Sequence, residues 1–384
     1  MPMNEFSEIR SLAAEVARDV YGPIAERLDV DRTPISREQR EQLGALGFLG
    51  VAHSERYGGA GAPLGAALVA IEEFGKVCRP AAFQIFEANT GPAQVIAHLG
   101  SEEQRQRWLP PIVSGATTMA VAISEPDAGS GATDMRTQAK PTDAGLILNG
   151  SKRWISNGGE ADQYLVYCRL SDSPGAKGIG AVVVDKGAPG VSFGSAERLM
   201  GFRGIPSADV IFDNVHVPLE DVVVPAGGFG RLFGIFAVER LGNSTMSLAI
   251  GQEALDRTIA YVQEREQFGK QLVEFQSIQV ALADMVLRVE SARQLLERAA
   301  ESAVSTGLPD PLKVSLAKCA CNEMAKRVTD MAIQLHGGNG YTEEYGIERL
   351  HRDAHGWAIA GGTPAMQRIR IVSELLGRRF DQRR

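Results

Sequence analysis

Residues 119–229 form a segment of short β-branched and alternating runs, without the three- and four-residue apolar spacing of helices. No helical stretch of about 10–15 residues separates the runs, so the crossovers that βαβ units need are missing. An antiparallel, barrel-like sheet domain is therefore expected here. A further run beginning at Leu146 is expected to end in a hairpin-type turn at Asn149-Gly150. The runs that fit other strands are 164–168, 179–184 and 210–217.

Helical patterns precede this segment. Ser36 with Gln39, and Ser101 with Gln104, have the spacing of capping boxes, in which the two side chains satisfy each other's backbone N–H groups. Each pair precedes an apolar run at helical spacing. The N-terminal part is therefore predicted to be a helical domain.

Long helices are predicted after the sheet segment. Apolar residues recur at three- and four-residue intervals over 273–301, and a second such helix opens at Asp310-Pro311 and stops at Gly337-Gly338. Long amphipathic helices in succession favour an antiparallel bundle, here a four-helix bundle. The predicted fold is mostly α with a central β domain, and its three domains are 1–118, 119–229 and 230–384.

Composition excludes several classes of protein. Lys and Arg number 40 against 47 Asp and Glu, and the net charge of −7 argues against a dedicated nucleic-acid binder. No apolar run is long enough for a membrane span, and the N-terminus lacks the features of a secretory signal. The four cysteines make neither a disulfide framework nor a zinc spacing, so no metal site is predicted. We expect a cytoplasmic protein.

Four motifs lie in different parts of the chain. They are AISEPDAGSG at 122–131, KRWISNGG at 152–159, EREQFGK at 264–270 and QLHGGNGY at 334–341. Further short matches, 349–353 and Gly361-Gly362-Thr363, stand near the end. In this order and at these separations the motifs resemble the acyl-CoA dehydrogenase family over essentially the whole chain. The resemblance implies FAD as cofactor and α,β-dehydrogenation of an acyl thioester.

The first two motifs suit a flavin. A flavin needs hydrogen-bonding groups at its polar edge and an apolar or aromatic surface against its ring. Ser124, Ser130 and Ser156 supply short hydroxyls, and Trp154 offers an indole face, although ordinary turn chemistry would explain the serines as well. The resemblance assigns Ile123, Ser124 and Ser130 to FAD contacts, Trp154 to the ring and Ser156 to a hydrogen bond near flavin N5.

The other two motifs belong, by resemblance, to the FAD site of a neighbouring subunit. Arg265 and Phe268 match the pair that reaches the adenine-dinucleotide part, and Gln334, Gly337 and Gly338 match the segment around the pyrophosphate. Glycine allows close backbone approach because it has no Cβ, and the two glycines also fit a helix C-cap. The resemblance therefore implies a homotetramer built as a dimer of dimers.

The catalytic base is the main departure from the family. Dehydrogenation needs a carboxylate at the α-carbon, and burial improves it by raising its pKa. Most members carry a Glu immediately before a Gly-Thr pair, but here that position is Gly361, followed by Gly362 and Thr363. The resemblance assigns Thr363 to the cofactor site. Isovaleryl- and long-chain-type members place the base on the first long helix of the bundle. The matching residue, Glu239, follows an apolar run and is the predicted base.

Other interpretations stay open. Glu239 and Arg240 also fit a helix N-terminal acid in a structural ion pair. Gly361 leaves room for desulfinase- or oxygenase-like chemistry on the same fold, or for an inactive flavin-binding paralogue. A desulfinase would need an Arg at the inner positions of the pocket helix, and residues 81–87 have none.

The substrate is only partly indicated. Phe83 and Glu87 share one helix face, which by family register lines the acyl pocket, and Arg240 and Gly361 are expected beside them. Phe83 would shorten the pocket and Glu87 would favour a polar acyl group, although a core Phe and a solvated Glu are equally consistent. The expected partners are an acyl-CoA or an acyl-carrier-protein thioester as substrate, and an electron-transferring flavoprotein as electron acceptor.

Overall fold

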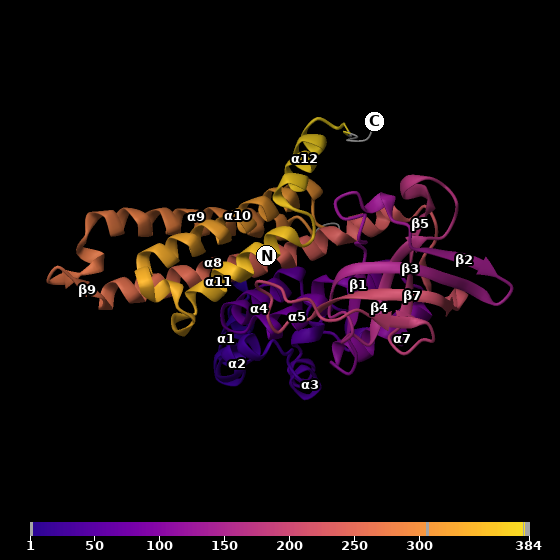
Figure 1. Cartoon of the computed structure of the whole chain (residues 1–384), viewed down its shortest axis with the longest axis horizontal. Coiled ribbons are helices and arrows are strands. Elements are labelled where there is room, and N and C mark those ends of the chain that lie inside the picture. The colour runs from indigo at the N-terminus through magenta and orange to yellow at the C-terminus, as the bar shows by residue number, and fades with distance from the viewer. Residues whose placement is uncertain (1–2, 305–306, 379, 381–384) are drawn as a thin grey trace.

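The computed structural model describes residues 3–304, 307–378 and 380, and Figure 1 shows the sheet at one end of the molecule with most of the helices to one side of it. The N-terminal helices pack beside the sheet, and the long C-terminal helices extend away from it. The predicted helix–sheet–helix fold is confirmed. The N-terminal helices are α1 (Ser7–Val16), α2 (Gly22–Asp31), α3 (Arg37–Ala45), α4 (Leu64–Val77), α5 (Arg79–Thr90), α6 (Pro92–Leu99) and α7 (Glu102–Val113).

Eight strands form the central sheet, in the order β6-β7-β3-β2-β4-β5-β8 with β1 added beside β4. The strands are β1 (Met119–Ala122), β2 (Gln138–Thr142), β3 (Gly145–Ser156), β4 (Gln163–Arg169), β5 (Ile179–Asp185), β6 (Val191–Phe193), β7 (Ser207–Val217) and β8 (Val222–Val224). The expectation of a wholly antiparallel sheet is wrong, because β1 runs parallel to β4 and β2 meets β4 at one parallel pair. The β2–β3 hairpin takes the place of a crossover helix between β1 and β4.

The turn predicted at Asn149-Gly150 is also wrong. The hairpin turn lies earlier, between the paired residues Thr142 and Gly145, and β3 continues through Gly150 with a shift of register. Gly150 has φ +142°, and a Cβ there would lie 2.5 Å from Thr137 Oγ1. The glycine therefore serves a β-bulge and a close approach within a long strand.

Both predicted capping boxes are confirmed. Gln39 N donates to Ser36 Oγ at 3.2 Å while Ser36 N donates to Gln39 Oε1 at 2.8 Å. Ser101 and Gln104 repeat the arrangement at the start of α7. Gln104 Nε2 also donates to the carbonyl of Glu220, which ties α7 to the last part of the sheet domain.

The C-terminal helices form the predicted bundle around α10, which packs against α8, α9 and α11. Gly242 brings α8 close to α5: a Cβ there would lie 2.3 Å from Thr90 Oγ1 and 2.6 Å from the Phe86 ring. The chain between α8 and α9 forms a small hairpin at the far end of the bundle, and α12 projects from the body (Figure 1). The elements are α8 (Phe229–Glu264), β9 (Glu266–Gln267), β10 (Lys270–Gln271), α9 (Gln276–Glu301), α10 (Pro311–His336), α11 (Ile347–Ile359) and α12 (Pro364–Leu375).

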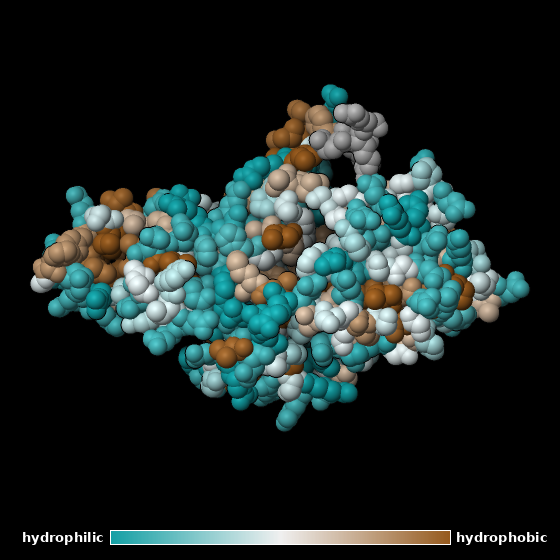
Figure 2. Space-filling view, viewed as in Figure 1, coloured by the Kyte–Doolittle hydropathy of each residue, from teal (hydrophilic) through white to brown (hydrophobic). Residues whose placement is uncertain are grey.

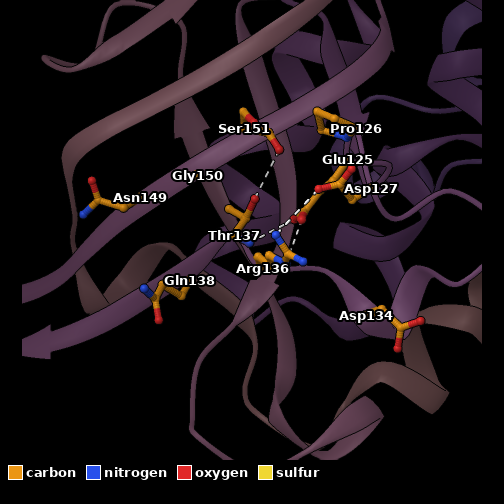
Figure 3. A pocket seen from close by; sticks show the side chains of 10 residues that line it. All are labelled: Glu125, Pro126, Asp127, Asp134, Arg136, Thr137, Gln138, Asn149, Gly150 and Ser151. Atoms are coloured by element: carbon orange, nitrogen blue, oxygen red, sulfur yellow. Dashed lines mark hydrogen bonds and ion pairs between the residues drawn. The ribbon is translucent and has the colours of Figure 1, made fainter.

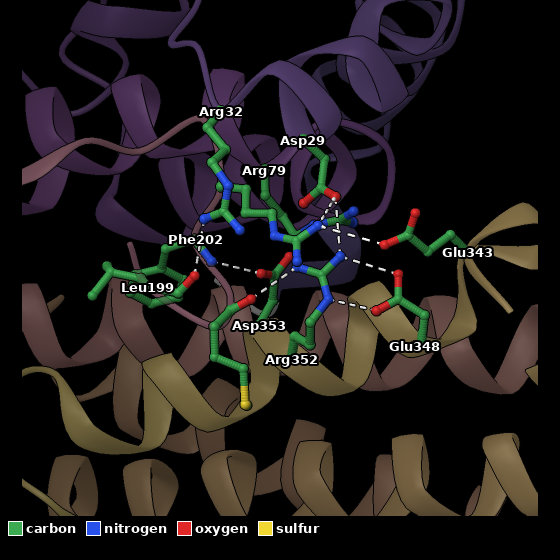
Figure 4. Close-up of polar contacts among 11 residues, drawn as sticks. Asp29, Arg32, Arg79, Leu199, Phe202, Glu343, Glu348, Arg352 and Asp353 are labelled. Carbon is green, nitrogen blue, oxygen red and sulfur yellow. Dashed lines mark hydrogen bonds and ion pairs between the residues drawn. The ribbon is translucent and has the colours of Figure 1, made fainter. Parts of the chain in front are cut away.

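Buried ion pairs join the N-terminal helices to the C-terminal bundle (Figure 4). Arg79 of α5 pairs with Asp353 of α11 at 2.7 Å, and both side chains are buried. Arg352 meets Asp29 of α2 at 3.0 Å, and Phe202 N donates to Asp353 Oδ1 at 2.8 Å. Removing one partner of a buried pair costs about 3–5 kcal/mol, so this network fixes α5 relative to α11.

The surface view is mostly hydrophilic, with apolar atoms gathered over α12 and the far end of the bundle (Figure 2). Within the described residues, no helix combines the length and apolar character required to cross a bilayer. All four cysteines are buried free thiols, as expected from the absence of a disulfide framework.

Candidate active site

Glu239 lies well inside α8, which begins at Phe229 and continues to Glu264. Its side chain is 9% exposed, and its Oε2 has no hydrogen-bond partner among the residues that the structure describes. Within the described residues, Arg240 forms no ion pair with Glu239. Its guanidinium instead lies over the rings of Phe233 and Phe236. The alternative reading of Glu239 as an N-terminal acid in an ion pair is therefore wrong.

Gly361 faces the Glu239 carboxylate directly. A Cβ at Gly361 would lie 3.3 Å from both carboxylate oxygens, and its φ of +68° favours glycine. Arg240 Nε donates to the Gly361 carbonyl at 3.0 Å and so holds this turn beside α8. Thr363 caps α12 by accepting from Met366 N at 3.4 Å. Positions 239 and 361, the two at which the resemblance places alternative bases, thus meet at one point of this fold.

Lys318 of α10 lies beside the same turn. Its side chain is 0% exposed, and Nζ donates to Asn243 Oδ1 at 2.8 Å, Asn322 Oδ1 at 2.9 Å and the Ala360 carbonyl at 2.8 Å. These acceptors satisfy all three ammonium donors. The arrangement holds the end of α11, and with it Gly361, against α8.

The acids of this region have shifted pKa values. Burial raises the pKa of Glu239 above the ordinary carboxyl range, while the charges of Lys318 and Arg240 pull it back. Burial raises the pKa of Glu87 well above its usual value, and the nearby charge of Glu239 adds to that rise. Glu87 Oε2 has no hydrogen-bond partner in the described chain. Burial thus disfavours the charged form of both acids, and among the described residues no hydrogen bond offsets this for Glu87 Oε2.

A narrow cavity opens in front of Glu239 between α5, α6, α8 and the sheet. Phe83 is not among its lining residues, because its ring stacks on Phe86 at 5.5 Å and packs near Trp357. Glu87 lines an adjoining cavity with Gln84 and Ala88. The cavity in front of Glu239 is lined by Thr90, Val95, Val121, Tyr167, Phe236 and Glu239, among others.

The first two motifs are held together where the chain after β1 meets β3. Arg153 N donates to the Ser124 carbonyl at 2.8 Å. The buried Lys152 ammonium donates to the Ile123 carbonyl at 3.0 Å and pairs with Glu125 at 2.8 Å. The Ile123–Glu125 turn is therefore clamped onto β3.

Trp154 has an unusual backbone and an unusual exposure. Its φ is +62°, which is rare for a bulky residue, and it sits in a register shift of β3. The indole is 52% exposed, and the Arg153 guanidinium lies 4.5 Å from the ring centroid. Ser124 and Ser156 are half-buried on the same two motifs, and Ser130 is exposed. A presented aromatic face beside hydroxyl and backbone groups fits a flavin.

The second group of predicted cofactor residues lies at the opposite end of α8. Arg265 follows this helix directly, about 39 Å from Glu239 at 1.5 Å per residue. Phe268 is 94% exposed with φ +55°. Gln334, Gly337 and Gly338 are exposed at the end of α10, where Gly337 is the C-cap. One chain therefore does not bring the two groups together.

A separate hollow lies beside the Glu125 clamp (Figure 3). Glu125 accepts from the backbone N–H groups of Arg136 at 2.6 Å and Thr137 at 2.9 Å. Asp127 and Asp134 also border it. Its named side chains are mostly polar or charged, and it lies apart from Glu239, which is not among its lining residues.

Sequence reasoning missed two side chains of the Glu239 region. Lys318 stands on the apolar stripe of α10, between Val314 and Cys321, and a Lys in that position is a signal of a buried charge. Tyr167 lies in an apolar strand, where the pattern indicates burial and nothing about its hydroxyl.

Comparisons with known proteins agree with this geometry. The N-terminal, middle and C-terminal domain models of acyl-CoA dehydrogenase match residues 3–116, 120–215 and 226–376. The short-chain-specific acyl-CoA dehydrogenase of Clostridium acetobutylicum is 34% identical over 369 residues, which are 96% of this chain and 97% of the relative.

Solved structures show the same fold. Butyryl-CoA dehydrogenase from Megasphaera elsdenii superposes with a TM-score of 0.93 at 33% identity, covering 97% of this chain and 98% of the other. The FAD complex of PigA superposes with a TM-score of 0.91 at 28% identity, with coverage of 97% and 98%. The chain therefore belongs to the acyl-CoA dehydrogenase family, and it is an FAD-dependent oxidoreductase of acyl-CoA thioesters.

Proposed function

We propose that Glu239 is the base that removes the α-proton of the acyl thioester. The observation that carries the proposal is the carboxylate itself: it is buried, one oxygen lacks a partner within the described residues, and it borders a cavity with an apolar lining. Bound FAD supplies the acceptor for the hydride that leaves the β-carbon. Glu239 holds the abstracted proton on its carboxylate oxygen.

The surroundings of Glu239 suit proton abstraction. Burial makes the carboxylate a stronger base by raising its pKa, while Lys318 and Arg240 keep enough of it ionised to act. Gly361 has no Cβ and so leaves space beside both carboxylate oxygens of Glu239, each of which would lie 3.3 Å from a Cβ at that position. The substrate α-carbon can then approach an oxygen that no other described group occupies.

Glu239→Gln tests this role, with Glu239→Asp as the matched variant. Both proteins should bind FAD, because the residues proposed to hold the flavin are on other elements. In anaerobic mixing with short acyl-CoA esters, Glu239→Gln should reduce the rate of flavin bleaching by roughly 10³-fold or more, and Glu239→Asp should retain a measurable part. Bleaching of Glu239→Gln at the wild-type rate would remove Glu239 from the mechanism.

A second reading rests on Gly361, which carries no carboxylate where most relatives have one. Desulfinase- or oxygenase-like chemistry, or an inactive flavin-binding paralogue, remains the alternative function. These alternatives predict an oxidised flavin with every simple acyl-CoA ester tested under anaerobic conditions. They also predict no difference between wild type and Glu239→Gln in that assay.

We also propose a homotetramer in which a neighbouring chain completes each FAD site. The length of α8 between Glu239 and Arg265 supports this, as does the exposure of the Phe268 ring. Subunit mixing tests this arrangement. Chains with Trp154→Ala and chains with Phe268→Ala should each bind FAD poorly when assembled alone. When co-assembled they should regain FAD, because a hybrid contains one site with both Trp154 and Phe268 intact. Co-assembled chains that stay as poor in FAD as either parent would refute the shared site.

The remaining assignments are proposals from family membership. The substrate is an acyl-CoA, with a carrier-protein thioester as the finer alternative. Electrons leave to an electron-transferring flavoprotein, and the protein works in the cytoplasm. Bleached flavin that is reoxidised on addition of an electron-transferring flavoprotein would support the partner directly.

A further inference from the structure

The hydroxyl of Tyr167 is a buried hydrogen-bonding group without a partner. Tyr167 lies on β4 with 0% exposure, and its Oη finds no donor or acceptor among the described residues. Tyr164, three residues earlier on the same strand, shows the usual arrangement: its Oη accepts from Gly159 N at 2.9 Å and donates to the Asn157 carbonyl at 3.3 Å. The buried Tyr21 hydroxyl likewise donates to the Gln39 carbonyl at 2.7 Å.

An unpartnered buried hydroxyl is unfavourable for folding. Leaving such a donor unsatisfied costs about 1–3 kcal/mol, and most buried polar groups in folded proteins have partners. Phenylalanine would fill nearly the same space without that penalty. The hydroxyl of Tyr167 is therefore best explained by a partner that arrives from outside the chain.

Tyr167 lines the same cavity as Glu239. The other walls include Val95, Val121 and Phe236, which offer no side-chain donor. Thr90 has a hydroxyl, but it donates to the Phe86 carbonyl at 2.8 Å. Within the described lining, Tyr167 is thus the neutral side-chain donor left over for a ligand.

The charged groups near Tyr167 keep it a phenol. Burial raises the pKa of Tyr167, and the adjacent charge of Glu239 raises it further, while Arg240 opposes the rise. A neutral phenol donates one hydrogen bond and accepts another. It therefore suits a neutral oxygen on a ligand better than a cation.

We propose that Tyr167 donates a hydrogen bond to an oxygen on the acyl chain, so that the preferred substrate is a short acyl thioester bearing a hydroxyl or carbonyl beyond the β-carbon. The inference rests on the proposed function, because that function places the acyl group in the cavity in front of Glu239. A purely alkyl chain would satisfy the apolar walls and leave the phenol unpaired. An oxygen at that point would satisfy both.

The test is a binding comparison on the holoenzyme with ligands that are already dehydrogenated and so do not turn over. Calorimetry would compare 4-hydroxycrotonyl-CoA with 2-pentenoyl-CoA, and 5-hydroxy-2-pentenoyl-CoA with 2-hexenoyl-CoA, each pair differing by OH against CH3. In wild type, at least one hydroxylated ligand should bind about tenfold more tightly than its methyl counterpart. Tyr167→Phe should remove that preference and leave the methyl ligands within about twofold of wild type.

Tyr164→Phe is the matched control, since it removes a phenol from the same strand that already has two partners. It should lower the thermal midpoint and leave the ligand preference unchanged. Tyr167→Phe should keep or raise the midpoint of the ligand-free holoenzyme, because it removes an unsatisfied donor. A fall in that midpoint as large as that of Tyr164→Phe would overturn the inference.

Other outcomes separate this inference from the proposed function. If Tyr167→Phe weakens hydroxylated and methyl ligands equally, the phenol binds a group common to all thioesters and the inference fails. If wild type shows no preference in either pair, yet oxidises butyryl-CoA in a Glu239-dependent way, the inference fails while the proposed function stands. If none of the four ligands binds, the proposed function fails with it.

Discussion

Replacing Lys318 by Met should move the pH dependence of proton abstraction. A Cβ at Gly361 would touch both the Glu239 carboxylate at 3.3 Å and Lys318 Cε at 3.4 Å, so the ammonium, one bond beyond Cε, stands within about 8 Å of the carboxylate. At an effective dielectric constant of about 20, two unit charges at that distance interact by about 2 kcal/mol, or roughly one to two pH units. Burial lowers the pKa of Lys318 to about 7, so the side chain carries its charge chiefly at and below that pH. Where it is charged, the cation favours the ionised form of Glu239, so its removal raises the pKa of the base.

The sign of the effect follows from the role of Glu239. The base must be ionised, so the rate of flavin bleaching rises with pH through its pKa, and in Lys318→Met that rise should occur one to two pH units higher. Below the shifted rise the variant is slow, and above it the rate should return toward wild type. Asn322→Leu is the control, because it disrupts the same buried network and keeps the ammonium.

Stopped-flow bleaching with a short acyl-CoA from about pH 6 to 10 would measure both profiles. A Lys318→Met profile that is lower at every pH, with its rise at the wild-type position, would refute the electrostatic argument. It would leave Lys318 as a residue that only holds the end of α11. The same uniform loss is expected of Asn322→Leu.

Three further predictions concern single residues. Glu87→Gln should flatten the pH dependence of the thermal midpoint. Burial raises the pKa of Glu87, so its contribution to stability is complete below the ordinary carboxyl pKa and is lost as pH rises through the folded value. Superimposable profiles for the two proteins would contradict its burial as an acid. Trp154→Asn should keep or raise the thermal midpoint of the FAD-free protein, because Asn tolerates φ +62°. The same variant should bind FAD at least tenfold more weakly, as measured by fluorescence titration. Unchanged FAD affinity would count against the flavin contact. Gly361→Ala should slow flavin bleaching about tenfold or more, because the added Cβ meets the Glu239 carboxylate. Gly377→Ala is the control: it also has a positive φ but lies in open space, so it should lose stability only. Equal bleaching rates in the two variants would contradict the crowding of Glu239.

Much of the fold could be predicted from local sequence signals. The capping boxes at Ser36 and Ser101 and the helix opened by Asp310 are local chemistry, and they are found where the sequence places them. The parallel pairing of β1 with β4 could not be predicted, because it depends on a hairpin inserted between distant segments. Gly150 shows the same limit: a bulge and a turn share their sequence signal, and the nearby Thr137 backbone decides between them.

The site could be predicted only in part. The apolar run before Glu239 indicated its burial, but the contact between Glu239 and Gly361 joins α8 to a turn far away in sequence. Lys318 was visible as a charge on an apolar stripe, although its acceptors come from three helices. The unpartnered hydroxyl of Tyr167 depends on what surrounds it in space, which an apolar strand pattern does not record.

The contact between positions 239 and 361 has an evolutionary consequence. Because a side chain at either position reaches the same point, a lineage can move a carboxylate between α8 and the turn that follows α11 through an ancestor that carries both. Two acids so close would share one charge, with one held protonated, so function need not be lost on the way. With glycine at position 361 and φ +68°, a return to glutamate there must place a Cβ at a backbone conformation that is strained for it. That Cβ would also lie against the Glu239 carboxylate. The change is therefore easier in one direction than in the other, and descendants of such an ancestor should tend to keep the arrangement found here.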